Sequence, residues 1–228
     1  MLGLGTGQAW AQPRLPALSY QAIWRLIRAG TVTIDTSQAE SRVKIDSAGL
    51  VSALYKVDDT YTVRADERHC VQATWLDAKQ GNRHRLAEVN YEKGRARYSE
   101  RDVLKDTVLR KAETEVPGCV HEVFSGIQLL RGMHLEPGQS TLVPMSDGRR
   151  AGQVKVEAQA REDVVTPSGT FHTIRYETFL MNGVIYPRNG HVHVWLTDDE
   201  RRVPVQIRMR LAFPIGTVLL QLEKQGKP

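Results

Sequence analysis

The last quarter of the chain constrains the fold most, because its apolar residues recur at every second position. Between Gly169 and Lys224, four successive segments alternate in this way, which predicts four β-strands in series. The sharpest signal runs from Val194 to Val205, where two alternating segments flank the charged sequence TDDERR. Two such segments joined by a short polar turn are typical of a β-hairpin. The C-terminal quarter therefore predicts antiparallel β-structure.

The same two-residue period continues through most of the chain and predicts about a dozen strands joined by short turns. Residues 154–161 give the clearest half-buried strand. Gly30 is expected to separate the first strand from the second, and the highly charged residues 101–116 are expected to form a loop. So many antiparallel strands usually curl. We therefore expect a mainly β protein, with a large curved antiparallel meander sheet or an open barrel.

Two segments have helical spacing instead. Residues 48–56 carry an apolar stripe that includes Leu50 and Leu54, and Ser47 before them is of a type that caps helices. Residues 120–131 form a second apolar stripe, and Gly132 is placed to end that helix. We expect both short helices to pack on the concave side of the sheet.

The 228 residues are 41% hydrophobic and 25% charged, which is typical of a folded domain and argues against disorder. We expect a single β-rich domain over residues 12–228. The net charge is +5, but the basic residues are scattered. Nucleic-acid binding proteins usually concentrate them with aromatic residues on one stripe, so we expect no nucleic-acid partner. The sequence has no stretch of 18 apolar residues, so we expect no membrane-spanning segment.

Residues 1–11 read as the remnant of a secretory signal segment. Ala9, Trp10 and Ala11 match the small-residue pattern of a signal cleavage site, and Gln12-Pro13 follows. The basic region and most of the apolar core of such a signal are missing. The alternative is a frayed N-terminus, which also places residues 1–11 outside the domain. We expect an exported, periplasmic protein.

Cys70 and Cys119 are the two cysteines of the chain, too few for a zinc site and not arranged as C-x-x-C. In an exported protein they can pair, and a disulfide closing a loop of this size adds about 4 kcal/mol in the chain-entropy model. The alternatives are two buried free thiols, or a Cys119 thiolate stabilised near His121. We favour the disulfide because export places the chain in an oxidising compartment.

Four parts of the sequence together resemble the DUF3108 family. They are Trp24 with Gly30, PGCVHEVFSGIQLLR at 117–131, TPSGTFHTIR at 166–175 and VWLTDDERRVPV at 194–205. Members of this family are exported bacterial proteins of unknown function. The resemblance implies a fold similar to the curved β-meander of lipoprotein carriers of the LolA/LolB type. It supplies no catalytic residues.

Three histidines are candidate metal ligands. His191 and His193 lie on one face of a predicted strand, about 7 Å apart by strand geometry. His172 on a neighbouring predicted strand could supply the third ligand that zinc requires. No carboxylate or cysteine falls at a matching spacing, so we favour a polar strand face and predict neither metal ion nor cofactor.

Aromatic residues give the candidate ligand contacts. Trp195 shares a strand face with His193, and Trp24 lies near the start of the domain. We assign Trp24, Trp195 and His193 as candidate ligand contacts. The alternative is packing, which is the commoner use of a tryptophan.

Two patterns that resemble catalytic sites fail on geometry. Asp198 and Asp199 are adjacent in a tight turn, so their side chains diverge, whereas glycosidase carboxylates face each other across a substrate. An Asp in such a turn usually accepts backbone N–H bonds. Ser125 is followed by glycine, but Val123 occupies the first glycine position of G-x-S-x-G. We therefore predict that the protein is not an enzyme.

Three functions stay open at this point. The first is a non-enzymatic binding or carrier protein for a lipid-like or other apolar small molecule, because a curved sheet with an apolar inner face can shelter one. The second is a structural or assembly protein of the cell envelope that acts through a protein partner. The third, which we rank last, is a metal-dependent hydrolase. An apolar cavity of roughly several hundred Å³ beneath the helices would favour the first, and a solidly packed interior would remove it.

Overall fold

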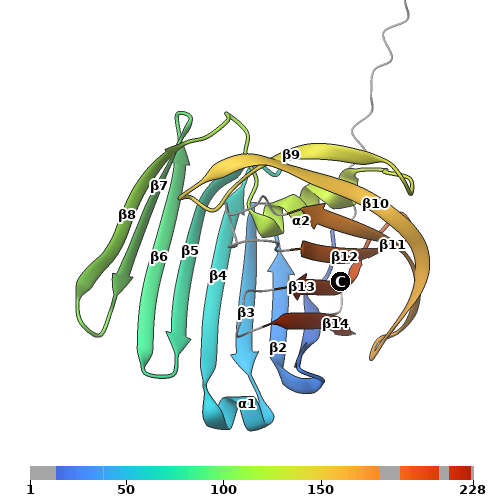
Figure 1. The fold of residues 1–228 in the computed structure, drawn as a ribbon, viewed down its shortest axis with the longest axis horizontal. Helices are drawn as coiled ribbons and strands as arrows, with labels where there is room; N and C mark the ends of the chain where they lie inside the picture. Colours follow the sequence, from blue (N-terminus) through green and yellow to red (C-terminus); the bar gives the residue numbers. More distant parts are fainter. Residues whose placement is uncertain (1–13, 38, 180–190, 211–215, 227–228) are drawn as a thin grey trace, which may run out of the picture.

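The computed structural model describes residues 14–37, 39–179, 191–210 and 216–226. The described residues form fourteen β-strands and two short α-helices (Figure 1). The strands are β1 (Leu18–Trp24), β2 (Ile27–Thr36), β3 (Glu40–Ser47), β4 (Val57–Ala65), β5 (Val71–Gln80), β6 (Arg83–Glu92), β7 (Arg95–Asp102), β8 (Thr107–Glu115), β9 (Ser140–Ser146), β10 (Ala151–Thr166), β11 (Gly169–Phe179), β12 (His191–Thr197), β13 (Pro204–Arg210) and β14 (Thr217–Gln225). The helices are α1 (Gly49–Leu54) and α2 (Val123–Gly132). The predicted signal remnant, residues 1–11, lies outside the described residues.

All of these strands belong to one antiparallel sheet. Its order is β8-β7-β6-β5-β4-β3-β2-β1-β14-β13-β12-β11-β10-β9. The first and last strands pair in its middle, from Leu18 opposite Gln225 to Trp24 opposite Val218. The two edges are therefore β8 and β9. The predicted curved meander is confirmed, with fourteen strands in place of about a dozen.

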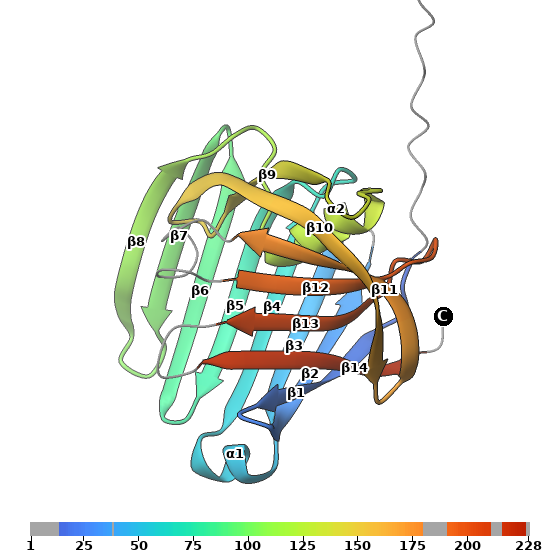
Figure 2. The same cartoon turned by 45° about the vertical axis from the view of Figure 1, so that its right-hand side comes forward.

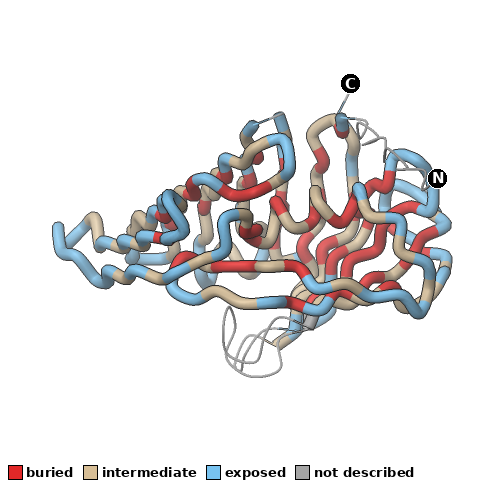
Figure 3. The backbone as a smooth tube through the Cα atoms, turned by 90° about the horizontal axis from the view of Figure 1, so that it is seen from above, coloured by how far each residue is buried: buried red, intermediate tan, exposed pale blue. Residues whose placement is uncertain are grey.

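The sheet coils so strongly that β11–β14 run across the direction of β2–β6 (Figures 1 and 2). The core fills the concave face, to which alternate residues of most strands point. Tyr20 on β1 is fully buried there, and its hydroxyl donates a hydrogen bond to the Pro204 carbonyl over 2.7 Å. Figure 3 shows buried segments around the centre of the molecule and a mainly exposed far arm at β8.

The turn between β9 and β10 rests on the arm formed by β6–β8. The Tyr91 hydroxyl on β6 donates to the Ser146 carbonyl over 3.3 Å. Gly148 has a φ of +83°, and a Cβ there would lie 2.6 Å from the methyl groups of Val89. Only glycine allows both this backbone conformation and this close approach. The contact joins one edge region of the coiled sheet to the other arm.

The helices take different positions. α2 lies on the concave face, as expected, and buries Ile127 and Leu130. α1 lies at one end of the sheet, where it joins β3 to β4 (Figure 1), and none of its residues is buried. The expectation that the helix at 48–56 packs on the concave side is therefore wrong. A six-residue helix at the rim of the sheet has no sheet face beneath it.

The expected cap of α1 is also wrong. Ala48 occupies the N-cap position and makes no side-chain cap bond. The Ser47 hydroxyl instead accepts a hydrogen bond from the Val57 backbone N–H over 2.8 Å. Ser47 therefore joins the two strands on either side of α1 and leaves the helix itself uncapped.

The expected loop at residues 101–116 is a strand. β7 continues to Asp102, and β8 follows from Thr107 to Glu115. β8 is an edge strand with charged residues on both faces, so it lacks the alternation that signals a half-buried strand. Charges such as these discourage nonspecific aggregation through an open edge.

Gly30 lies inside β2 and does not separate two strands. A Cβ built on Gly30 would lie 2.2 Å from the Asp46 carbonyl oxygen on β3. Gly30→Ala is therefore expected to lower the free energy of unfolding by about 2 kcal/mol, because the strand must shift to relieve the overlap. Urea unfolding measures this loss.

Gly118→Ala provides the matched control. No atom lies within 4 Å of a Cβ at Gly118, so its effect should stay below about 0.5 kcal/mol. Equal midpoints for the two variants would contradict the close approach of β2 and β3 at Gly30.

Candidate functional site

The N-terminus of α2 is closed by a reciprocal capping arrangement. Glu122 occupies the N-cap position, and its carboxylate accepts the backbone N–H groups of Phe124 (2.9 Å) and Ser125 (2.5 Å). The Ser125 hydroxyl accepts the Glu122 N–H over 3.0 Å. This pairing satisfies helix N–H groups that would otherwise be unpaired in the core.

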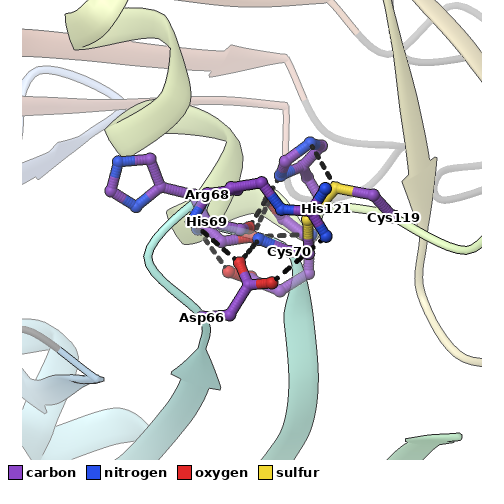
Figure 4. Close-up of a disulfide and its surroundings, with 8 residues drawn as sticks. Asp66, Arg68, His69, Cys70, Cys119 and His121 are labelled. Carbon is purple, nitrogen blue, oxygen red and sulfur yellow. Dashed lines mark hydrogen bonds and ion pairs between the residues drawn. A yellow bond between two sulfur atoms is a disulfide. The ribbon is translucent and has the colours of Figure 1, made fainter. Parts of the chain in front are cut away.

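The segment before this cap is held by a disulfide between Cys70 and Cys119 (Figure 4). The predicted pairing of these two cysteines is confirmed. His121 is buried beside it, with Nδ1 at 2.7 Å from the His69 carbonyl and Nε2 at 3.7 Å from Cys119 Sγ. The Asp66 carboxylate accepts the Cys70 backbone N–H over 2.8 Å. The start of α2 is thus joined covalently to the turn between β4 and β5.

Burial shifts the titration of the groups in this region. It raises the pKa of Glu122 to about 7, against the lowering effect of the two backbone N–H donors. Burial also raises the pKa of Tyr61 well above its ordinary value. It lowers the pKa of His121, so the neutral imidazole is favoured. The groups at the N-terminus of α2 are therefore buried, and their shifted pKa values favour the uncharged forms.

The C-terminal end of α2 is held by a buried arginine. Arg131 donates from Nε to the Arg202 carbonyl over 3.1 Å and from Nη2 to the Arg201 carbonyl over 3.0 Å. Burial lowers the pKa of Arg131 to about 10. Both acceptors lie in the turn between β12 and β13, the charged turn of the C-terminal hairpin. This contact is non-covalent, unlike the disulfide at the other end of α2.

The same turn gives the two aspartates structural roles. Asp199 Oδ1 accepts the backbone N–H groups of Arg201 (3.1 Å) and Arg202 (3.0 Å), as expected for a turn aspartate. Asp198 forms an ion pair of 2.7 Å with Arg161 on β10. The carboxylates are used separately, which agrees with the prediction that they do not act as a pair.

A cavity of about 40 Å³ lies between the middle of α2 and strands β9–β12. Its lining residues are Val123, Gly126, Ile127, Leu130, Met133, Val143, Met145, Val156, Thr178, Val192 and Val194. Thr178 is the one polar side chain among these described residues, and its hydroxyl donates to the Val192 carbonyl over 3.2 Å. Apolar cavities of this kind stay dry and accept apolar guests.

A second cavity of about 20 Å³ lies on the other flank of α2, towards β1, β2 and β13. Its walls include Leu18, Tyr20, Phe124 and Ile207. Ile127 lines both cavities. The apolar side chains of α2 therefore border unfilled space on both flanks of the helix, while the disulfide and Arg131 hold its two ends.

The structure does not bring the three predicted ligand contacts to this cavity. On β12, Val192 and Val194 face the cavity, so the alternate residues His193 and Trp195 point to the other face of the sheet. Trp195 is only 4% exposed, and its Nε1 donates to Glu162 over 2.5 Å. Trp24 lies at the end of β1, with the Arg25 guanidinium 4.8 Å from its ring centroid. Ligand contact by these residues stays a prediction, and packing accounts for the position of Trp195.

His172 and His193, two of the three candidate metal ligands, each lie beside a different carboxylate. His172 Nδ1 lies 2.5 Å from Asp163, and His193 Nε2 lies 3.6 Å from Glu177. The side chain of His191 lies outside the described part of the structure. Within the described part, no group of three His, Cys, Asp or Glu residues is arranged to hold a metal ion.

Sequence reasoning missed the two residues that anchor α2. Glu122 is the N-cap of α2, and Ser125 three residues later is the sequence signal that could have identified it. Arg131 is the basic residue in the last turn of α2. Its buried contacts to the turn between β12 and β13 join positions 70 residues or more apart in sequence, so no local pattern predicts them.

Comparisons with known proteins identify related sequences and folds. The family described as "Protein of unknown function (DUF3108)" matches residues 19–223. The comparison with curated proteins found no match.

The structure is similar to a crystal structure of a β-barrel-like protein of the domain of unknown function DUF1849 from Brucella abortus. The sequence identity is 10%, and the TM-score is 0.60 over 96% of this chain and 100% of that chain. A weaker likeness, with 12% identity and a TM-score of 0.41, is to a DUF1089 family protein from Pseudomonas aeruginosa, over 90% of this chain and 95% of that one. No helix among the described residues is long and apolar enough to cross a membrane.

Proposed function

Since the chain belongs to the DUF3108 family, whose function is unknown, we propose from its geometry that it is a non-enzymatic binding or carrier protein for a lipid-like or other apolar ligand. The ligand binds in the cavity between α2 and strands β9–β12. The observation that carries the proposal is α2 itself. Its anchors are at its two ends, and its apolar middle leaves cavities along both flanks.

The size of the cavity determines how a ligand enters. About 40 Å³ is far below the roughly 300–1,000 Å³ of typical small-molecule sites, so the expected cavity of several hundred Å³ is not found beneath α2. An acyl chain therefore requires α2 to move away from the sheet. The N-terminal end is fixed by the disulfide, whereas the C-terminal end is held by hydrogen bonds from Arg131. We propose that α2 swings outward about its N-terminal end.

We also propose that the protein acts in the periplasm. A disulfide such as Cys70–Cys119 persists in an oxidising compartment, which supports export. Fractionation of the native cells tests this directly. Recovery of the protein in the cytoplasmic fraction with two free thiols would contradict it.

Titration with a fluorescent fatty acid, dansyl-undecanoic acid, tests the carrier proposal. We expect saturable binding of one probe per chain. Val192→Phe, which fills the cavity from β12, should weaken this binding by about tenfold or more.

Arg131→Leu, which frees the C-terminal end of α2, should accelerate probe uptake. Val143→Phe offers a second cavity-filling variant on β9 if Val192→Phe does not fold.

Val108→Phe is the matched control, because it makes the same substitution at an exposed position of the edge strand β8. It should leave probe binding unchanged. Absence of saturable binding, or equal binding by folded Val192→Phe and the unsubstituted protein, would contradict the proposal.

One observation favours a second candidate function, an envelope assembly protein that acts through a protein partner. β8 is an open edge, and Val108 and Leu109 are exposed on it. An open edge can accept a strand from a partner. If the protein has this function, Val108→Phe should change complex formation in envelope extracts. The unsubstituted protein should then show no binding of the fatty-acid probe.

A further inference from the structure

One end of the molecule exposes a leucine at the tip of a turn. Leu26 lies between β1 and β2 and is 98% exposed. It has a φ of +68°, and Arg25 before it has a φ of +49°. Non-glycine residues rarely adopt this conformation. Arg25 is exposed beside Leu26, with its guanidinium over the Trp24 ring. Ile27, the first residue of β2, is exposed beside them.

The neighbouring connection at the same end also exposes apolar side chains. Leu50 and Leu54 of α1 are 66% and 80% exposed, and Tyr55 after the helix is exposed too. The Ala48 backbone N–H donates to the Ala29 carbonyl over 2.8 Å, so the start of α1 is bonded to β2. Figures 1 and 2 show α1 and the turn between β1 and β2 together at this end. We call Leu26, Ile27, Leu50, Leu54 and Tyr55 the apolar tip.

Basic residues surround the apolar tip. The three chain segments that form this end, residues 24–29, 47–57 and 79–84, contain no Asp or Glu. They contain five exposed basic residues, which are Arg25, Arg28, Lys56, Lys79 and Arg83. The turn between β5 and β6 is bonded to this end, because the Gly81 N–H donates to the Lys56 carbonyl over 2.8 Å.

The acidic residues nearest in sequence are Asp46, Asp58 and Asp77, and all three are paired. Asp77 lies 3.8 Å from Lys79 and 2.8 Å from His84, so it offsets part of the charge at the turn between β5 and β6. Asp46 and Asp58 both contact Lys44. Glu223 on β14 forms an ion pair of 2.9 Å with Arg28. Asp102, the last residue of β7, and Asp106 in the turn between β7 and β8 balance Arg101 and Lys105, so the excess of positive charge ends at β6. The apolar tip is therefore bordered by a positive region of limited width.

We propose that the apolar tip binds the surface of a membrane that contains anionic lipids. The leucine side chains enter the headgroup boundary, and the basic residues contact lipid phosphates. Protruding apolar turns with a basic border suit a soft anionic surface better than a protein groove. This proposal does not depend on whether a ligand binds in the cavity beneath α2.

Co-sedimentation with lipid vesicles tests the proposal on the intact protein. The probes are vesicles of phosphatidylcholine and vesicles in which part of it is replaced by phosphatidylglycerol. We expect binding to the phosphatidylglycerol vesicles that weakens as salt is added, because salt screens surface charges. Leu26→Ser with Leu54→Ser should weaken binding by about tenfold or more. Lys56→Glu with Arg83→Glu should have a similar effect through charge alone.

Leu142→Ser with Val165→Ser is the matched control, since both residues are exposed apolar positions outside the apolar tip. This variant should bind vesicles as the unsubstituted protein does. All substituted positions are exposed, so folding should survive, and circular dichroism checks this. Absence of vesicle binding, or unchanged binding by the Leu26/Leu54 variant, would overturn the proposal. Self-association abolished by that variant, without vesicle binding, would instead identify the tip as a contact between copies of the chain.

Discussion

Replacing both Cys70 and Cys119 by serine is expected to lower the free energy of unfolding by about 4 kcal/mol. The two residues are 49 positions apart in sequence, and a loop of that length gives this value in the chain-entropy model. The closed loop contains β5 and the arm formed by β6–β8. Without the disulfide, the conformational entropy of the unfolded chain rises while that of the native sheet does not, so the free energy of unfolding falls.

Urea unfolding followed by far-ultraviolet circular dichroism measures this loss. The unsubstituted protein in a reductant should unfold at the same lower midpoint as the double variant, because both lack the same constraint. Cys70→Ser alone serves as a control for the side chain, and it should match the double variant. A double variant within about 1 kcal/mol of the oxidised protein would contradict a stabilising role for the disulfide.

The sheet was predictable wherever one of its faces is buried and the other is not. β10 and β13 alternate clearly because apolar residues such as Val154, Val156 and Ile207 point to the core. β8 was missed because neither of its faces is buried, so its sequence carries no alternation. The pairing of β1 with β14 joins residues about 200 positions apart, and no local pattern indicates that.

The candidate site was predictable only in part, for a similar reason. The period of the 120–131 segment predicted the buried face of α2, and the two cysteines predicted the disulfide. The cavity depends on how Val143 and Val192 meet the helix across the coiled sheet, which periodicity does not specify. α1 has the same helical period, but its stripe faces solvent. Helical spacing predicts a helix with an apolar face, and the surrounding topology decides whether that face is covered.

The stability of the protein is expected to fall by about 3 kcal/mol as the pH rises from about 4.5 to about 7, through the titration of Glu122. Burial raises the pKa of Glu122 from 4.5 to about 7 in the folded protein. The folded state therefore holds the proton more tightly than the unfolded state does. The resulting stabilisation is complete below the unfolded pKa and is lost as the pH rises through the folded pKa.

The comparison with Glu122→Gln isolates this titration from others. Burial lowers the pKa of His69 and His121, so their contributions run in the opposite direction and are lost as the pH falls. Glutamine does not ionise, and it keeps one of the two oxygens that accept the N–H groups of Phe124 and Ser125, so the slope of stability with pH is compared and not its absolute value. The variant should therefore lose the decrease in stability between about pH 5 and about pH 8 that the unsubstituted protein shows in urea unfolding.

Parallel pH profiles for the two proteins would show that Glu122 does not titrate in this range. If the profiles diverge as expected, ionisation of Glu122 destabilises the folded state near neutral pH, because the cost of burying the charge outweighs its stronger hydrogen bonds to the Phe124 and Ser125 N–H groups. The disulfide still holds the start of α2, because a covalent bond does not titrate with the cap. A buried carboxyl at the N-cap therefore makes the stability of the fold dependent on pH, while Cys70–Cys119 holds the N-terminal end of α2 at every pH.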